Sequence, residues 1–319
     1  MKRIIATVGP SLLNDIPLTE VHNPRNIYRI NGAHGSIDDI ENYICEIRTQ
    51  VSDSEILMDL PGNKVRTANV DKAIAIKTGE FFELGFHQTN YPDFYSLLNK
   101  GNVVWANDST FEFTVDSIDI KQKVIRFLSK STGYLENNKG LHVRGIHDDM
   151  PFLFQKDEEL IELANKHKLN YVGLSFVRNE QDILQAKDFI NHGIKIISKV
   201  ETKAAVVNLI AILKEVDFIL VDRGDLSTEV GIEKIPAYQA HILNKALYFN
   251  KKVFLATQFL KNMETNPIPT IPEVIDLYNT LQMGIYGIQM SEETAVGKYP
   301  KECLEMIAKL MDEIELKEI

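Results

Sequence analysis

IKIISKVE at residues 194–201 and DFILVDRGD at residues 217–225 are short apolar runs that each end in charged residues. Residues two apart in a β-strand share a face, so Lys199 and Glu201 should point the same way, and Asp225 should approach them from the next strand. A cation, two carboxylates and a glycine turn in one place suit a divalent metal that holds a phosphorylated substrate. The alternative interpretation is a solvated Lys/Glu pair beside an ordinary strand-to-helix turn.

The same unit, a short apolar run with a polar end followed by a helical stretch, recurs along the chain. The eight runs lie at residues 2–9, 26–32, 54–62, 170–178, 194–201, 217–225, 252–258 and 286–294. Amphipathic stretches lie between them, for example at residues 157–168, 203–216, 235–249 and 272–284. Apolar strands that alternate with helices imply a parallel sheet covered on its outside, and eight of them predict an α/β fold, the (β/α)8 TIM barrel.

Polar residues follow the C-terminal ends of these predicted strands, where a barrel of this type carries its active site. They are Arg29 and Asn31, Asp59 and Arg66, Ser175 and Arg178, Lys199 and Glu201, Arg223 and Asp225, Thr257 and Gln258, and Ser291 and Glu293. For Arg178 and Gln258, a satisfied loop residue is at least as good an interpretation as a direct role. The recurrence of polar residues around the whole ring favours a functional site.

One connection is too long for a loop, because residues 68–147 separate the third predicted strand from the next helix. Strand-like runs within it predict a small β-rich lid domain, inserted into a barrel formed by residues 1–67 and 148–319. An inert insertion or an assembly surface is the alternative. Trp105, the only tryptophan, is expected in the core of the insertion.

The composition narrows the class of protein. The 319 residues are 44% hydrophobic and 25% charged, as in a globular protein with one large and one small domain. A formal net charge of −10 argues against nucleic acid as a partner, and no apolar stretch is long enough to span a membrane. Because no signal-peptide pattern is present, we expect a cytoplasmic protein. Cys45 and Cys303 are too few for a disulfide framework and are expected in the core.

An ordered set of motifs extends along nearly the whole chain. It comprises ATVGPS (6–11), YRINGAHG (28–35), MDLPGNKVRT (58–67), KGLHVRG (139–145), GLSFVR (173–178), ISKVET (197–202), RGDL (223–226), ATQFL (256–260), NPIPT (266–270) and SEETAVGKYP (291–300). Taken together, these motifs resemble those of the pyruvate kinase family. The resemblance implies a glycolytic phosphotransferase that uses Mg²⁺ or Mn²⁺ to transfer the phosphoryl group of phosphoenolpyruvate to ADP, giving pyruvate and ATP.

The resemblance also implies roles for individual residues. The metal ligands would be Glu201 and Asp225, and the catalytic residues would be Lys199, Arg29 and Thr257. The substrate site would comprise Arg29, Ser175, Lys199, Gly224, Asp225 and Thr257, with the Gly224 and Asp225 amides on the substrate carboxylate. The nucleotide site would comprise Asn31, His34, Arg66 and Lys139, and Asp108 would contribute from the lid side. A surrounding layer would comprise Asp59, Ser291 and Glu293.

One departure from the family pattern concerns a monovalent cation. Typical members bind K⁺ with an Asn, a Ser, an Asp and a Thr, and this chain keeps Asn31 and Asp59 but has Ala33 and Leu60. Lys64 occupies a position that is Lys in K⁺-independent members, so its ammonium would stand in for the ion. The resemblance therefore predicts that K⁺ is not required, and a solvated surface role for Lys64 is the alternative.

Other departures concern the nucleotide and the assembly. Glu292 and Val296 replace a glycine and a lysine that helps to hold the nucleotide, which leaves the nucleotide preference and the acceptor open. Ile271 replaces an arginine used at a subunit interface, and the chain ends at Ile319, before the C-terminal allosteric domain of typical members. We therefore expect a monomer or homodimer without that domain.

Two other functions stay open. A divergent homologue would act on another enol phosphate or another acceptor, or as a metal-dependent aldolase or lyase of a pyruvate-like acid. A noncatalytic protein would bind phosphoenolpyruvate as a sensor. The presence of Arg29, Lys199 and Thr257 favours phosphoryl transfer over both.

Overall fold

The computed structural model describes residues 1–107 and 110–317, which form two compact units. One unit comprises Met1–Gly62 and Phe152–Ile319, and the other comprises Asn63–Pro151. The predicted boundaries after residues 67 and 147 differ from this division by a few residues at each end. The difference arises because backbone hydrogen bonds join Val65 to Leu141 and Thr67 to Lys139, which ties both connecting segments to the second unit.

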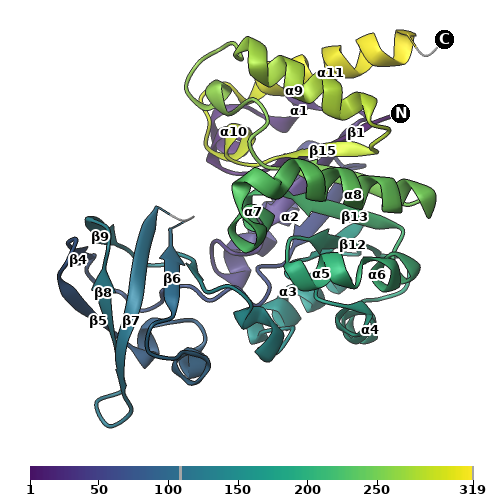
Figure 1. Ribbon diagram of the computed structural model, residues 1–319. Coiled ribbons are helices and arrows are strands. Elements are labelled where there is room, and N and C mark those ends of the chain that lie inside the picture. The colour runs from purple at the N-terminus through teal and green to yellow at the C-terminus, as the bar shows by residue number, and fades with distance from the viewer. Residues whose placement is uncertain (108–109, 318–319) are drawn as a thin grey trace. The chain divides into compact units, whose positions relative to one another are not determined.

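Eight parallel strands of the first unit close into a barrel that is surrounded by helices (Figure 1). They are β1 (Arg3–Thr7), β2 (Asn26–Asn31), β3 (Glu55–Asp59), β11 (Tyr171–Leu174), β12 (Lys195–Val200), β13 (Phe218–Asp222), β14 (Lys252–Ala256) and β15 (Gly287–Met290). Their order around the ring follows the chain, and β15 pairs with β1 to close it. The predicted TIM barrel is confirmed, and each of the eight predicted runs contains one of its strands.

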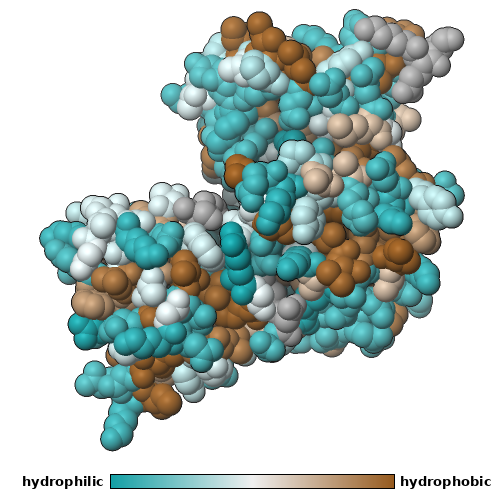
Figure 2. Space-filling view, viewed as in Figure 1, coloured by the Kyte–Doolittle hydropathy of each residue, from teal (hydrophilic) through white to brown (hydrophobic). Residues whose placement is uncertain are grey.

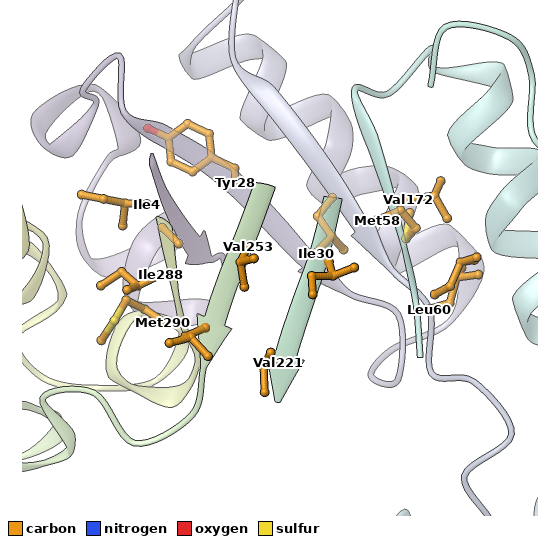
Figure 3. Close-up of a cluster of buried hydrophobic side chains, with 14 of the residues drawn as sticks. Ile4, Tyr28, Ile30, Met58, Leu60, Val172, Val221, Val253, Ile288 and Met290 are labelled. Carbon is orange, nitrogen blue, oxygen red and sulfur yellow. The ribbon is translucent and has the colours of Figure 1, made fainter. Parts of the chain in front are cut away.

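Neighbouring residues along each strand pack into two different apolar cores. One core fills the barrel interior and includes Ile5, Ile27, Leu57, Tyr171, Ile197, Leu220 and Phe254. The other includes Ile4, Tyr28, Met58, Val172, Val221, Val253 and Ile288, which pack between the strands and the helices (Figure 3). Both faces of the sheet are therefore covered, which is why the runs are almost continuously apolar in the sequence.

The helices of the first unit alternate with the strands. They are α1 (Leu18–Val21), α2 (Ile37–Gln50), α3 (Gln155–Lys166), α4 (Glu180–Phe189), α5 (Lys203–Val207), α6 (Leu209–Glu215), α7 (Arg223–Val230), α8 (Ile235–Tyr248), α9 (Ile271–Gln282), α10 (Glu292–Ala295) and α11 (Pro300–Lys317). Cys303 is buried as expected, but the expectation for Cys45 is wrong. Cys45 is exposed because Ile40, Ile44 and Ile47 form the buried face of α2.

The second unit is built from antiparallel strands, as expected for the insertion. They are β4 (Ile74–Ile76), β5 (Phe81–Gly85), β6 (Val103–Ala106), β7 (Phe111–Asp119), β8 (Val124–Ser129), β9 (Gly133–Leu135) and β10 (Leu141–His142). A five-stranded sheet has the order β10-β6-β7-β8-β5, and β4 pairs with β9. Phe82, Phe113 and Phe127 form its aromatic core. Trp105 is only half-buried, contrary to expectation, and Arg144 lies over its ring.

The surface is mostly hydrophilic on the face shown in Figure 2. Exposed apolar side chains on α9 include Ile271 and Ile275. Among the described residues, no helix is both long enough and apolar enough to cross a membrane.

Gly287 provides a test of how tightly the barrel closes. A Cβ atom at this position would overlap the carbonyl oxygen of Arg3 on β1 and the ring of Phe254 on β14. Because both obstacles belong to the barrel wall, we expect Gly287→Ala to lower the free energy of unfolding by about 3 kcal/mol in urea denaturation.

Gly85→Ala is the matched control for that substitution. Gly85 has a φ of −68°, and the atoms nearest to a Cβ there belong to the side chains of His87 and Gln88. These side chains can move, so the control should unfold nearly as the wild type does. Equal effects of the two substitutions would contradict the tight closure of the barrel at Gly287.

Candidate active site

The barrel interior changes from apolar to charged toward the C-terminal ends of its strands. Five polar residues each follow an interior apolar residue by two positions and so share its face: Thr7 after Ile5, Arg29 after Ile27, Asp59 after Leu57, Lys199 after Ile197, and Asp222 after Leu220. Strand alternation therefore stacks a polar layer on the apolar one, at the end of the barrel where active sites of this fold lie.

Lys199 contacts three carboxylates within this layer. Its Nζ lies 3.3 Å from Glu201 Oε2, 3.7 Å from Asp59 Oδ2 and 3.8 Å from Asp222 Oδ2. Burial opposes the ammonium charge, but the three carboxylates outweigh it and raise the pKa of Lys199 above the ordinary value for lysine. The alternative of a solvated Lys/Glu pair is therefore wrong, because Lys199 is only 6% exposed and Glu201 is fully buried.

Arg29 is a second buried cation, and Asp59 links it to the first. Arg29 Nε donates to Asp59 Oδ2 at 2.6 Å, and its Nη1 donates to Thr7 Oγ1 at 2.7 Å. The same Asp59 oxygen faces Lys199 Nζ. Gly173 leaves room for the other oxygen, since a Cβ there would lie 2.8 Å from Asp59 Oδ1. Asp59 thus contacts both cations through one oxygen and links their positions.

Glu201 is held from one side only. Its Oε1 accepts a hydrogen bond of 2.7 Å from the amide of Phe176, whose φ of +56° lies in the left-handed region. Its Oε2 accepts no hydrogen bond from the described residues, although it faces Lys199 Nζ. Burial raises the pKa of Glu201 to about 8, and Asp225 and Asp222 contribute to the increase against the opposing effect of Lys199. The negative charge on Glu201 is therefore incompletely compensated.

Glu201, Asp222 and Asp225 form a carboxylate group that fits a divalent cation. One oxygen atom from each residue lies within 4.8 Å of the others. Asp59 and the cations Lys199 and Arg29 lie beside this group. The clustered carboxylate oxygens and the buried Glu201 Oε2 both suit Mg²⁺ or Mn²⁺, which prefer carboxylate oxygen ligands.

Asp222 is the member of this group that sequence reasoning missed. The signal was present, because Asp222 lies in the same run as Asp225 and two residues beyond the apolar Leu220. Its Oδ1 accepts hydrogen bonds from Gly224 N at 3.1 Å, Asp225 N at 3.4 Å and Thr257 Oγ1 at 2.7 Å. A carboxylate of the protein thus caps α7 at the two amides that the resemblance assigns to the substrate carboxylate.

Thr257 lies on a strained turn that Arg223 supports. Thr257 and Gln258 have φ values of +81° and +58°, which residues other than glycine rarely adopt. Arg223 donates to the carbonyl oxygen of Thr257 from Nε at 3.1 Å and from Nη2 at 2.6 Å, and its guanidinium lies 4.0 Å from the ring centre of Phe259. Arg223 therefore holds the backbone that presents the Thr257 hydroxyl.

Ser175 is also brought into the group, as predicted. Its Oγ accepts a hydrogen bond from Lys199 Nζ at 3.1 Å and donates to the carbonyl oxygen of Leu60 at 2.7 Å. The Arg178 guanidinium pairs with Asp182 at 2.6 Å, which agrees with the interpretation of a satisfied loop residue.

Asn31 is the last residue of β2, and His34 lies in the loop that follows. Asn31 Oδ1 accepts a hydrogen bond from Ala33 N at 3.1 Å, and the backbone carbonyl of Asn31 accepts one from His34 N at 3.3 Å. These bonds shape the loop, and the assignment of both residues to a nucleotide stays a prediction.

Ser291 and Glu293 belong to a different acidic group. Ser291 N donates to Glu293 Oε2 at 2.9 Å, and Glu293 lies with Glu264 and Glu292. Burial raises the pKa of Glu293 to about 7. Their predicted place around the Lys199 group stays a prediction.

Three predicted residues belong to the second unit. The backbone amide of Arg66 donates to Asn90 Oδ1 at 2.7 Å, and Arg66 Nη1 donates to the carbonyl oxygen of Lys64 at 3.3 Å. Lys139 pairs with Glu136 at 3.5 Å. The assignment of Arg66 and Lys139 to a nucleotide and of Lys64 to the place of K⁺ stays a prediction. Asp108 lies outside the described residues.

Known proteins match this chain over nearly its whole length. The family described as "Pyruvate kinase, barrel domain" matches residues 1–304. A pyruvate kinase of Thermotoga maritima is 32% identical over 99% of this chain and 71% of its own length, and one of Thermococcus litoralis is 31% identical over 97% and 68%. A pyruvate kinase of Geobacillus stearothermophilus is 29% identical over 99% of this chain and 56% of its own length. The resemblance seen in the ordered motifs is confirmed.

Proposed function

Because this chain belongs to the pyruvate kinase family, which is a family of phosphotransferases, we propose that it transfers the phosphoryl group of phosphoenolpyruvate to ADP. The products would be pyruvate and ATP. The observation that carries this proposal is the buried ammonium of Lys199, with three carboxylates at 3.3 to 3.8 Å. Phosphoryl transfer depends on positioned charges of this kind more than on covalent chemistry by the protein.

The family generally depends on a divalent metal, and Glu201 and Asp225 would hold Mg²⁺ or Mn²⁺ in this chain. When bound, the ion would neutralise charge on the substrate oxygens and help to orient them. Glu201 is prepared for this role because the Phe176 amide fixes one of its oxygens and leaves the other without a hydrogen bond from the described residues.

Lys199 and Arg29 would act on the phosphoryl group as it moves. Lys199 remains protonated at neutral pH because its pKa is raised, so it offers a permanent positive charge. Arg29 offers N–H donors in a planar array that matches phosphate oxygens, and Asp59 and Thr7 fix its orientation. Both cations are therefore preorganised, and the protein need not rearrange as the phosphorus–oxygen bond to the enol oxygen breaks.

Thr257 would assist the second half of the reaction, in which the enolate takes up a proton at carbon to become pyruvate. Its hydroxyl donates to Asp222 Oδ1, and the strained turn fixes that hydroxyl in place. A threonine hydroxyl is too weak an acid to supply a proton alone, so Thr257 would relay a proton from water.

Pyruvate formation from phosphoenolpyruvate, ADP and Mg²⁺ tests the proposed function. Steady turnover with equal amounts of pyruvate and ATP would support it. Turnover of phosphoenolpyruvate only with another acceptor would favour the divergent homologue. Binding of phosphoenolpyruvate without any turnover would favour a sensor, and the absence of binding and turnover in folded protein would overturn the proposal.

We also expect that the activity does not require K⁺. The ammonium of Lys64 would supply the positive charge, so rates in tetramethylammonium chloride and in KCl at equal ionic strength should agree. Lys64→Ala should lose activity in the absence of K⁺, while the control Lys77→Ala, which removes a mostly exposed lysine of the same unit, should not. A strict K⁺ requirement of the wild type in steady-state kinetics would contradict this expectation.

A further inference from the structure

We propose that Asp222 is a third carboxylate ligand of the divalent cation, beside Glu201 and Asp225. The inference rests on the proposed metal-dependent function and assigns a role to a residue of this chain that neither the motifs nor the family name single out. Four features of the carboxylate group carry it: the convergence of the oxygens, the fixation of one Asp222 oxygen, the orientation of the other toward Lys199, and the repulsion between neighbouring carboxylates.

The oxygens of the three residues converge on one place. One oxygen from each lies within 4.8 Å of the others. Asp222 Oδ2 and Glu201 Oε2 also lie 3.8 Å and 3.3 Å from the same atom, Lys199 Nζ. Oxygen ligands of an octahedral Mg²⁺ are separated by about 3 to 4 Å, since each lies about 2.1 Å from the ion. Only a small contraction of the group would therefore bring all three carboxylates onto one cation.

The Asp222 carboxylate is preorganised for this purpose. Gly224 N, Asp225 N and Thr257 Oγ1 all donate to Oδ1, which is thereby fully used. Oδ2 is left turned toward Lys199. The side chain is 14% exposed, so it lies at the boundary between the polar layer and the solvent-accessible end of the barrel. One oxygen thus anchors the side chain, and the second remains available to a cation.

Capping α7 does not by itself explain an aspartate at this position. Asparagine and serine cap helices about as well as aspartate does, and they carry no charge. An ionised aspartate beside Glu201 and Asp225 adds repulsion between like charges in a largely buried place. A divalent cation bound among these carboxylates would offset that repulsion.

Direct binding of Mn²⁺ to the substrate-free protein tests this role. Free Mn²⁺ is measured by electron paramagnetic resonance for the full chain and for Asp222→Asn, Asp222→Ser, Asp225→Asn and Asp217→Asn. Asparagine and serine at position 222 retain the helix cap, so α7 should stay formed. Asp217 lies just before the opposite end of β13 with its side chain 86% exposed, and it controls for the loss of one negative charge.

Both substitutions of Asp222 should raise the Mn²⁺ dissociation constant about tenfold or more, as should Asp225→Asn, while Asp217→Asn should leave it unchanged. An unchanged constant for folded Asp222→Asn, together with weaker binding by Asp225→Asn, would overturn the role of Asp222 and leave the proposed function intact. The absence of Mn²⁺ binding by the wild type would overturn the inference and the metal dependence together.

Discussion

Lys199→Met is expected to lower the rate of pyruvate formation by about a thousandfold, the size of effect seen when a cation that neutralises a transferring phosphoryl group is removed. Methionine keeps the unbranched shape of the side chain but carries no charge. Loss of the Lys199 ammonium would leave the carboxylates of Glu201, Asp59 and Asp222 without their shared cation. The measurement is the steady-state rate with saturating phosphoenolpyruvate, ADP and Mg²⁺.

Lys195→Met is the control. Lys195 is exposed and begins β12, at the opposite end of the strand from Lys199, and its ammonium lies over the ring of Tyr171 on β11. It should retain wild-type turnover. Circular dichroism must show that both variants are folded. A folded Lys199→Met variant with near wild-type turnover would contradict a charge-neutralising role for Lys199 and would leave Arg29 as the remaining candidate cation.

Glu201→Gln is expected to have opposite effects on activity and on stability. Turnover should fall by at least a hundredfold, because a metal ligand and its negative charge are lost. The metal-free protein should become more stable at pH 9 by about 1 to 3 kcal/mol, because a buried and poorly compensated charge is removed. Glutamine can still accept the hydrogen bond from Phe176, and Asp59 and Asp222 remain near Lys199.

The pH dependence of stability follows from the raised pKa of Glu201. A carboxyl whose pKa is about 8 in the folded protein, against 4.5 ordinarily, holds its proton more tightly when folded. The favourable contribution of this carboxyl to the free energy of unfolding is complete below pH 4.5 and is lost as the pH rises through about 8. The wild type should therefore lose stability relative to Glu201→Gln between these values.

Thermal unfolding of chelator-treated protein at pH 6 and pH 9 measures the stability effect. Added Mg²⁺ should raise the unfolding temperature of the wild type and not that of Glu201→Gln. A variant that is less stable than the wild type at pH 9 would contradict the poor compensation of Glu201. An equal response of both proteins to Mg²⁺ would remove Glu201 from the metal site.

The candidate site was predicted from sequence where local alternation was sufficient. Lys199 and Glu201 lie two apart on β12, and the expectation that they face the same way is met by the 3.3 Å between their charged atoms. Asp222 was missed because its importance depends on contacts with Thr257 and Lys199, which belong to other strands. Nothing in the run around Asp222 tells a helix cap from a metal ligand.

Other differences between expectation and structure also arise from packing that neighbouring residues do not reveal. Cys45 is exposed although its segment is a helix, because three isoleucines define which face of α2 is buried. Arg223 lies in a charged motif, and its guanidinium supports the turn at Thr257 and pairs with Asp276. In both cases the identity of the element was evident and the direction of the side chain was not.

Apolar periodicity and motif order are properties of neighbouring residues, so they were enough to predict the eight strands and the polar residues at their ends. Which charges meet depends on how the ring closes. Closure of the ring brings Asp59 of β3 and Asp222 of β13 to the same Lys199, although these residues lie far apart in the chain. Burial then decides the chemistry, since the same carboxylates would be ordinary solvated charges if water could surround them.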